Sequence, residues 1–281
     1  MNIAKILTSY ATQDGDGVNI SRIPGFDGKY LDPFLMIDEL KSDNEADYMG
    51  GFPAHPHRGM ETFTYIIKGG FEHKDQMGNK KAIRAGDVQW MSTGNGVVHS
   101  EMPLSDAKDG LHGFQIWINM PSKEKMRDPI YQDTTQSPAP TFKNENGVTL
   151  TALASSWQFE AVELTSSIQK LSANAALADV TLPAGKQLKL DPLKQQNVML
   201  YIHSGSLITP DNQTFKAGKL LILEPGSDID IATQHGAGVL ILAGDPLKQP
   251  IAHMGPFVMT TQAEIQQAVR DYQNGQFGTL I

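Results

Sequence analysis

Glycine and proline interrupt this sequence roughly every ten residues, and the stretches between them are short and rich in β-branched and aromatic side chains. Residues 62–67, 114–118, 198–202, 219–223 and 239–242 are such stretches. This rhythm predicts an all-β sandwich or barrel rather than alternating strands and helices. The sequence holds no glycine-rich dinucleotide fingerprint and no P-loop, so chemistry on bound nucleotides is not expected.

One stretch near the end of the chain departs from this rhythm. Between residues 261 and 273, apolar side chains recur at the spacing of one helix face, at Ile265, Ala268, Val269 and Tyr272. Thr260 or Thr261 can cap the start of a helix, and Gly275 is a stop signal. We therefore expect a C-terminal amphipathic helix that covers the end of a barrel.

The two halves of the sequence share a pattern. A strand that ends in glycine at residues 66–70 is followed by Ala-Gly and another strand at 85–88, and the same order recurs at 201–205 and 217–220. This indicates a diverged internal repeat. Between the halves, the polar segment 121–146 is typical of a linker or long connection. The sequence thus predicts two tandem β-barrels, at residues 1–135 and at residues 136–281, with the helix in the second.

Composition excludes several classes of function. The net charge is −8 and no basic tract occurs, which disfavours binding to nucleic acid. Cysteine is absent, so disulfides, thiolate metal sites and cysteine nucleophiles are excluded. No apolar run approaches the ~20 residues of a membrane-spanning helix, and the first residues do not resemble a secretory signal. We expect a cytoplasmic protein that does not contact membranes.

Histidines and carboxylates gather at two places in the first half. His55 and His57 lead into the strand that follows Glu61, and His99 precedes Glu101 by two positions. Because side chains two apart in a strand share a face, His55, His57 and Glu61 can lie together, as can His99 and Glu101. Two such strands across a narrow barrel supply three imidazoles and one carboxylate, or two carboxylates if Glu61 joins. The pattern predicts a metal site.

The donor set narrows the choice of metal. Imidazole suits zinc, copper, iron and nickel, whereas histidine with carboxylate and open positions is the pattern of non-haem Fe(II) oxygenases. Zinc sites are more often closed by four ligands. In the second half His203, His235 and His253 have no partner at ligand spacing, and His112 also stands alone in the first. The C-terminal barrel is therefore expected to be free of metal.

Five short segments resemble the pirin family of cupin proteins. They are Gly-Phe-Pro-Ala-His-Pro-His-Arg-Gly-Met-Glu-Thr at 51–62, Gly-Asp-Val-Gln-Trp-Met at 86–91, His-Ser-Glu-Met-Pro at 99–103, Gly-Phe-Gln-Ile-Trp at 113–117 and Gly-Pro-Phe-Val-Met at 255–259. The resemblance implies two tandem cupin barrels of jelly-roll type. It also implies one divalent metal ion per chain, Fe(II), held by His55, His57, His99 and Glu101. Glu61, a ligand in many other cupins, is then a hydrogen-bond partner of a ligand or an alternative ligand.

The same resemblance implies two functions. The first is quercetin 2,3-dioxygenase activity, in which O2 opens the ring of a flavonol or similar aromatic molecule and Glu101 accepts the flavonol proton. Phe52 and Pro53 then line the mouth of the substrate pocket, or they pack in the barrel rim. The second is an iron-dependent regulatory protein that senses redox state and binds a protein partner, with no physiological turnover.

Overall fold

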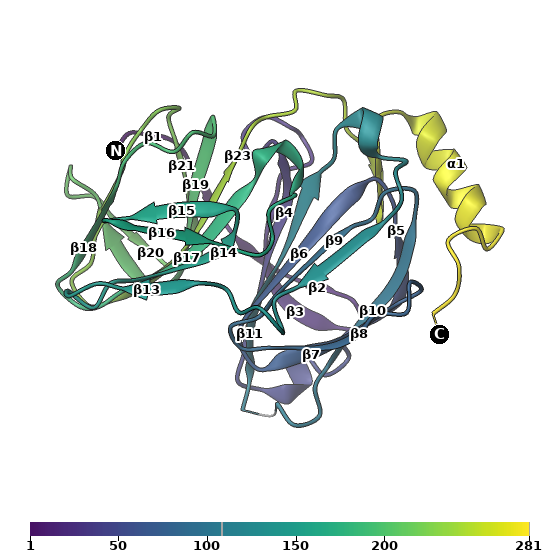
Figure 1. Cartoon of the computed structure of the whole chain (residues 1–281), viewed down its shortest axis with the longest axis horizontal. Coiled ribbons are helices and arrows are strands. Elements are labelled where there is room, and N and C mark those ends of the chain that lie inside the picture. Colours follow the sequence, from purple (N-terminus) through teal and green to yellow (C-terminus); the bar gives the residue numbers. More distant parts are fainter. Residues whose placement is uncertain (108, 281) are drawn as a thin grey trace. The chain divides into compact units, whose positions relative to one another are not determined.

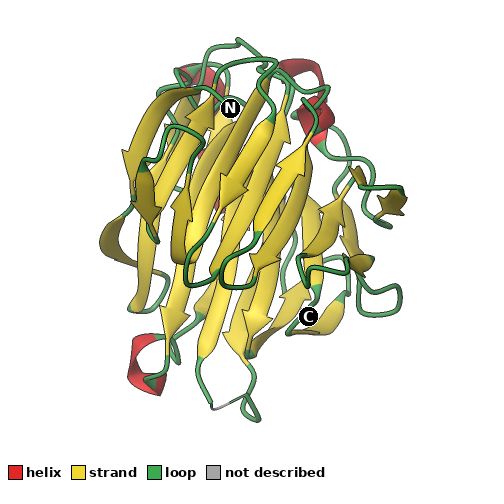
Figure 2. Ribbon diagram, turned by 90° about the vertical axis from the view of Figure 1, so that its left-hand side faces the viewer, coloured by secondary structure: helices red, strands yellow, loops and turns green. Residues whose placement is uncertain are grey.

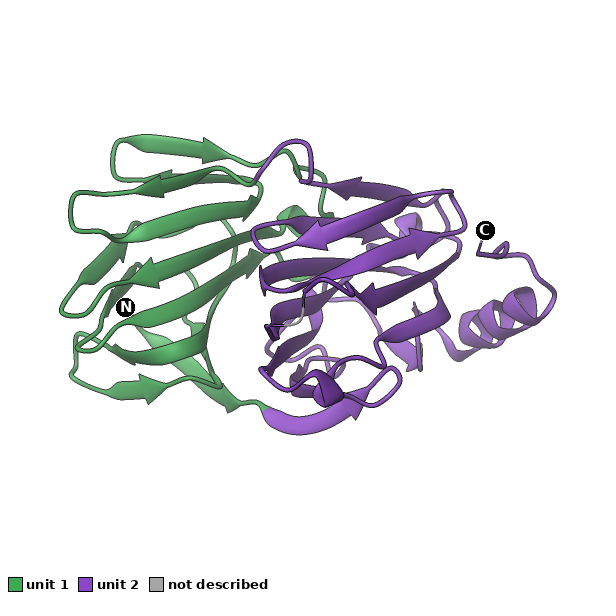
Figure 3. Ribbon diagram, turned by 90° about the horizontal axis from the view of Figure 1, so that it is seen from below, with its two compact units in different colours: residues 1–9, 139–246 green, residues 10–138, 247–281 purple. Residues whose placement is uncertain are grey.

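The structure, a computed structural model, describes residues 1–107 and 109–280, and strands make up most of it (Figure 2). The all-β architecture with one C-terminal α-helix is confirmed. Two compact units are present (Figure 3). The N-unit comprises residues 10–138 and the segment that begins at Leu247, and the C-unit comprises residues 1–9 and 139–246. Among the described residues, no helix is long and apolar enough to cross a membrane.

Each end of the chain belongs to the unit formed mainly by the other half of the sequence. Strand β1 (Ile3–Thr8) pairs with β21 (Lys219–Leu223) and so completes a sheet of the C-unit. The last residues, with the helix, belong to the N-unit. The division into one barrel at residues 1–135 and another at residues 136–281 stays a prediction, and the compact units differ from it at both ends. Strand pairing between distant segments leaves no local signal, and the sequence therefore could not indicate this exchange.

The N-unit is built on two antiparallel sheets (Figure 1), and its C-terminal segment adds a two-stranded one. The larger sheet has seven strands in the order β12, β9, β6, β11, β4, β3, β2, with the bounds Ile130–Asp133, Val88–Ser92, Met60–Lys68, Leu111–Asn119, Phe34–Ser42, Val18–Pro24 and Tyr10–Asp14. The smaller has four strands in the order β5, β10, β7, β8, with the bounds Phe52–His57, Val97–Pro103, Gly70–Asp75 and Lys80–Arg84. Two short 3-10 turns lie in the connections of the N-unit: η1 (Glu45–Asp47) between β4 and β5, and η2 (Ser122–Glu124) between β11 and β12.

Apolar and polar side chains divide the interior of the N-unit. One cluster of buried apolar residues joins both sheets and includes Ile20, Leu40, Ile66, Phe71 and Ile83. Burying each such side chain stabilises the fold by ~1.5–3 kcal/mol. Elsewhere, polar side chains meet between the same two sheets. For example, the Thr64 hydroxyl on β6 donates to the Glu101 carboxylate on β10 over 3.0 Å.

The C-unit is built on one extended antiparallel sheet. Its main path is β1, β21, β19, β23, β17, β14, β13, and the strands after β21 have the bounds Asn197–Ile208, Ala237–Gly244, Ala176–Leu182, Thr149–Ala154 and Thr141–Lys143. Off this path lie β18 (Gln187–Leu190), β20 (Thr214–Lys216) and β22 (Ile229–Ala232). A separate hairpin joins β15 (Ser156–Phe159) to β16 (Val162–Thr165), and η3 spans Ser172–Asn174. Its core is one large apolar cluster.

At the positions of the internal repeat expected from the sequence, the two units form equivalent backbone hydrogen bonds. In the N-unit the Gly86 amide donates to the Ile66 carbonyl over 2.8 Å, and in the C-unit Gly218 donates to Ile202 over 2.8 Å. Both glycines have a positive φ, 90° and 85°. Residues with a side chain rarely adopt such angles, which explains why Ala-Gly recurs at this turn.

The segment 121–146 contains more order than its composition indicates. Strand β12 pairs with β9 in the N-unit, and β13 pairs with β14 in the C-unit. Both are edge strands whose residues are exposed or half-buried. Such strands need few apolar side chains, so the pattern that reveals a buried strand is missing from their sequence.

The C-terminal segment folds onto the strand that carries the His-x-His pair. It forms β24 (Ala252–Met254), β25 (Phe257–Met259) and α1 (Gln262–Gln273), and the predicted helix is confirmed with Thr261 as its capping residue. Arg58 binds the segment in two ways. Its guanidinium donates to Asp271 on α1 over 2.7 Å, and it lies 4.5 Å from the centre of the Phe277 ring. The side chains of Arg58 and Asp271 are both largely buried.

Replacing Asp271 by asparagine is expected to lower the free energy of unfolding by about 3 kcal/mol, because Arg58 would keep its buried charge without a counter-charge. Urea denaturation measures this loss. The matched control is Arg270→Gln, which removes an exposed charge from the same turn of α1 and should leave stability nearly unchanged. Equal stability of the two variants would show that α1 does not depend on the Arg58 pair.

Candidate metal centre

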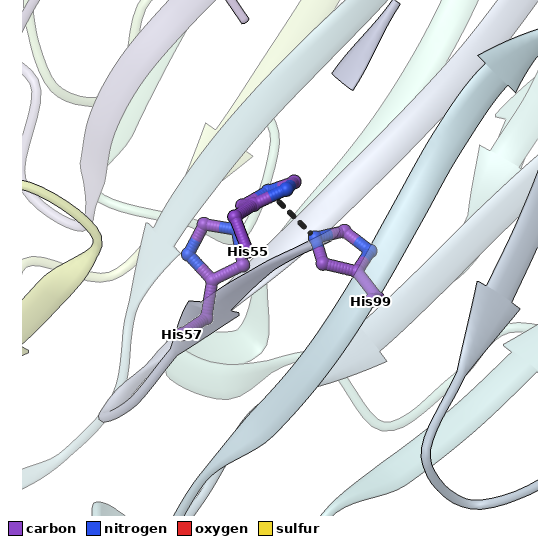
Figure 4. A group of neighbouring side chains, drawn as sticks. All are labelled: His55, His57 and His99. Carbon is purple, nitrogen blue, oxygen red and sulfur yellow. Dashed lines mark hydrogen bonds between the residues drawn. The ribbon is translucent and has the colours of Figure 1, made fainter. Parts of the chain in front are cut away.

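Strand register brings three histidines together in the N-unit. Strands β5 and β10 are antiparallel, with His55 opposite His99 and His57 opposite Val97. Because side chains alternate, all three imidazoles project from the same face of the small sheet, where they meet (Figure 4). Their ring centres are 4.4–5.0 Å apart. One ring nitrogen of each lies within 4.8 Å of the others.

The nitrogen atoms at this meeting point fit a metal ion. His55 Nε2 and His99 Nε2 lie 3.0 Å apart. In a neutral imidazole one ring nitrogen carries a proton and the other carries a lone pair. Without a metal, two facing nitrogens can therefore form one hydrogen bond, in which one donates and the other accepts. An ion placed between them accepts both lone pairs at once. Three convergent imidazoles without sulfur suit first-row divalent metals.

Two carbonyl groups fix the orientation of two of these rings. His55 Nδ1 lies 2.7 Å from the Pro53 carbonyl oxygen, and His57 Nδ1 lies 3.3 Å from that of Pro256. A carbonyl only accepts, so each Nδ1 carries the proton and each Nε2 keeps its lone pair. This is the tautomer that ligation through Nε2 requires. Pro256 belongs to the C-terminal segment, which thereby orients a residue of the His-x-His pair.

Burial keeps two of these histidines in the neutral form. Both His57 and His99 are almost wholly inaccessible to solvent. Burial, together with repulsion from neighbouring imidazoles, holds the pKa of His57 and of His99 well below its ordinary value. Since only neutral imidazole binds a metal, the site is prepared for binding at neutral pH.

Glu101 lies on the same strand as His99 but belongs to a second group. Its carboxylate accepts hydrogen bonds from Thr64 and Gln89, 3.0 Å each, and from Gln115, 2.7 Å. The potential ligand atoms of Glu101, His99 and His73 lie within 4.8 Å of one another and form this second group. The first group consists of His55, His57 and His99. Glu101 lines the same cavity as His55 and His57. As the fourth ligand it stays a prediction.

Glu61 lies apart from both groups of ligand atoms among the described residues. Its carboxylate accepts from the Trp90 indole over 3.1 Å and from Arg127 over 3.2 Å. The structure does not place it on one face with His55 and His57, because β5 ends at His57 and β6 begins only at Met60. Gly59, with a φ of 78°, turns the chain between them, so the alternation of side chains does not continue.

A cavity of about 540 Å³ opens onto this site. Phe52 and Pro53 line it together with Trp117 and a stacked pair, Phe26 and His253, whose ring centres are 4.1 Å apart. The Trp117 ring also meets His57 edge-on, 5.1 Å between centres. Apolar and aromatic surface therefore approaches the histidine group directly.

Sequence reasoning missed His73, which lies at the centre of the second group. The ring is fully buried on β7, its Nε2 is 3.0 Å from Asp75, and it stacks on Tyr131 with 4.7 Å between centres. The signal was present as His-x-Asp at i and i+2, the same spacing that drew attention to His99 and Glu101. Two other histidines that lack partners in the sequence find carboxylates in the fold, His112 with Glu39 and His203 with Asp179.

Known proteins resemble this chain in sequence and in fold. The family model described as Pirin matches residues 19–118, and that of the pirin C-terminal cupin domain matches residues 177–278. A Vibrio cholerae protein named provisionally as a quercetin 2,3-dioxygenase is 43% identical over 278 residues, covering 99% of this chain and 98% of its own.

Solved structures agree with these matches. The crystal structure of quercetin 2,3-dioxygenase from Acinetobacter baumannii has a TM-score of 0.88 at 28% identity, covering 100% of this chain and 99% of that chain. A bacterial pirin from Escherichia coli, solved in complex with nickel(II), has a TM-score of 0.61 at 20% identity, over 86% of this chain and 100% of that one. At that identity the likeness concerns the fold. The chain therefore belongs to the pirin family and carries its two cupin domains.

Proposed function

We propose that this protein is a mononuclear non-haem iron dioxygenase that opens the ring of a flavonol with O2. The observation that carries the proposal is the meeting of three imidazoles beside an open cavity lined by aromatic side chains. The V. cholerae relative and the A. baumannii structure bear the name of this activity, which supports the choice of substrate.

One Fe(II) ion per chain is proposed, held by His55, His57, His99 and Glu101. The absence of sulfur and the mixture of imidazole with carboxylate favour iron, and the nickel(II) complex of the E. coli pirin supports a divalent ion in this fold. When bound, such an ion supplies redox chemistry and open coordination positions for small oxygen ligands.

The residues of the chain would bind and deprotonate the substrate. A planar aromatic molecule would bind in the cavity that Trp117 and the stacked pair of Phe26 and His253 line, with Phe52 and Pro53 excluding water at the mouth. Thr64 and Gln89 hold Oε1 of Glu101. Oε2, which accepts from Gln115, is then the atom that takes the flavonol hydroxyl proton.

Aerobic turnover of quercetin by the Fe(II)-loaded protein is the direct test. Loss of the flavonol absorbance together with release of carbon monoxide is expected from wild type, and Glu101→Ala should lose most of it. Equal turnover in both proteins would mean that iron outside this site does the chemistry. No turnover in verified Fe(II)-loaded wild type would favour the second function, a redox-sensing protein that binds a protein partner.

Metal affinity should fall on acidification, but only below the ordinary histidine pKa of ~6.5. Burial lowers the pKa of His57 and His99, so both rings stay neutral until the pH is lower than that value. Below it, protons compete with the metal for the imidazole lone pairs. Metal content after equilibration at each pH from 7 to 4 measures the effect. A bound fraction that stays constant over this range would contradict ligation by histidine.

Glu101→Gln should weaken Fe(II) binding more than Glu61→Gln. The first change removes the proposed anionic ligand and its neutralisation of charge on the ion. The second leaves the ligand groups intact and disturbs the contacts to Trp90 and Arg127. Competition with a chromogenic chelator under anaerobic conditions gives both dissociation constants. A larger loss in Glu61→Gln would make Glu61 the carboxylate ligand instead.

A further inference from the structure

We propose that His73 and Asp75 form a hydrogen-bonded relay that orients His99 toward the metal. In this relay the His99 Nδ1–H donates to His73 Nδ1, and the His73 Nε2–H donates to the Asp75 carboxylate. The proposal rests on the metal centre proposed above but not on flavonol turnover. His73 and Asp75 act through His99 and are therefore positioning residues.

Each of the two rings has one buried nitrogen without a hydrogen-bond partner among the described residues. His99 directs Nε2 at His55, and its Nδ1 is buried without a hydrogen-bond partner among the described residues. His73 directs Nε2 at Asp75, and its Nδ1 is likewise buried and without a partner in the part of the chain that the structure describes. Buried polar atoms in proteins are nearly always paired. Two neighbouring rings with one such nitrogen each can satisfy one another.

Strand register places these rings side by side. Strand β10 pairs with β7 as well as with β5, and on this side His99 is opposite Asp75 while Glu101 is opposite His73. His73 and His99 therefore share a face of the small sheet on adjacent strands. Their ring centres are 5.5 Å apart, and one ring nitrogen of each lies within 4.8 Å of the other. Neither Nδ1 atom has a hydrogen-bond partner among the described residues, so the relay requires a ring rotation that brings the two atoms together.

The proton positions agree from both ends of the relay. Burial alone would raise the pKa of Asp75, but hydrogen bonds from His73 and Asn79 outweigh it and lower the pKa below its usual value. An ionised Asp75 only accepts, so His73 Nε2 carries a proton, and the relay takes His73 as the neutral tautomer whose Nδ1 keeps its lone pair. At the other end, ligation through His99 Nε2 leaves the proton on Nδ1. A donor therefore faces an acceptor.

Such an arrangement affects the metal as well as the ring. A ligand histidine that donates its second N–H is fixed in tautomer and orientation, and becomes a more basic ligand. The negative charge of Asp75 would act through two imidazoles and favour the higher oxidation state of iron. Asp75 is itself held by the Met77 amide and the Asn79 side chain, 2.9 and 2.8 Å, so the relay ends on a fixed carboxylate.

The test uses Fe(II) affinity and the Fe(III)/Fe(II) midpoint potential of the full chain. His73→Phe keeps a ring against Tyr131 but removes both nitrogens, and Asp75→Asn keeps the shape but removes the charge. Both should weaken Fe(II) binding, by ~10–100-fold for His73→Phe, and Asp75→Asn should raise the midpoint potential. The matched control is His112→Phe, which removes another buried histidine–carboxylate pair of the N-unit and should change neither quantity.

Three results would overturn the relay. One is unchanged affinity and potential in both variants while their thermal midpoints fall as in the control, which would make His73 merely structural. Another is a second tightly bound ion in wild type that His73→Phe removes, since His73 would then be a ligand with His99 and Glu101. The third needs no variant and covers the case in which the variants do not fold. In Zn(II)-loaded wild type, ¹⁵N NMR should find protons on His73 Nε2 and His99 Nδ1, and a proton on His73 Nδ1 would exclude the relay. None of these measurements depends on flavonol cleavage.

Discussion

The antiparallel pairing of β10 with its two neighbours is the constraint on which the metal centre depends. On one side of β10, His99 lies opposite His55 on β5. On the other side, His99 and Glu101 lie opposite Asp75 and His73 on β7. The register toward β5 shifts between His99 and Glu101, so that Glu101 faces Phe52. Bulges of this kind redirect side chains. A slip of one residue would turn both His99 and Glu101 away from the interior.

The last residues of the chain hold the other half of the centre in place. The Pro256 carbonyl orients His57, and the next residue, Arg58, is fixed by Asp271. Beyond it, the buried Lys125 ammonium donates to the carbonyls of Gly59 and Val258, 2.6 and 3.1 Å. Burial lowers the pKa of Lys125 to about 8. Residues 57–59 are thus attached to a segment some two hundred residues later in the sequence. The candidate site therefore depends on the packing of that segment against β5.

What the sequence revealed about this molecule was local. Alternation within a strand indicated that His55 and His57 share a face, and helical spacing with Thr261 indicated α1. What depends on pairing between distant strands stayed hidden. Glu61 seemed to continue the face of His57 because the turn at Gly59 was not recognised, although glycine there is the residue that permits a φ of 78°. His73 was overlooked because a lone histidine becomes informative only once β7 is placed beside β10.

The repeated turn allows a residue-by-residue comparison of the two units. If Ile66 corresponds to Ile202, as their matching hydrogen bonds indicate, then Thr62 and Thr64 on β6 correspond to Val198 and Leu200 on β19. On β6 the Thr64 hydroxyl donates to Glu101, whereas the valine and leucine on β19 are part of the apolar core of the C-unit. Buried hydroxyl and amide groups destabilise a core unless they are paired. In the N-unit the Glu101 carboxylate pairs with Thr64, Gln89 and Gln115, so the polar interior and the carboxylate require each other. In the C-unit, apolar residues at the equivalent positions of β19 give a barrel interior that is built for stability, and a polar residue introduced there would have to bring its own partner.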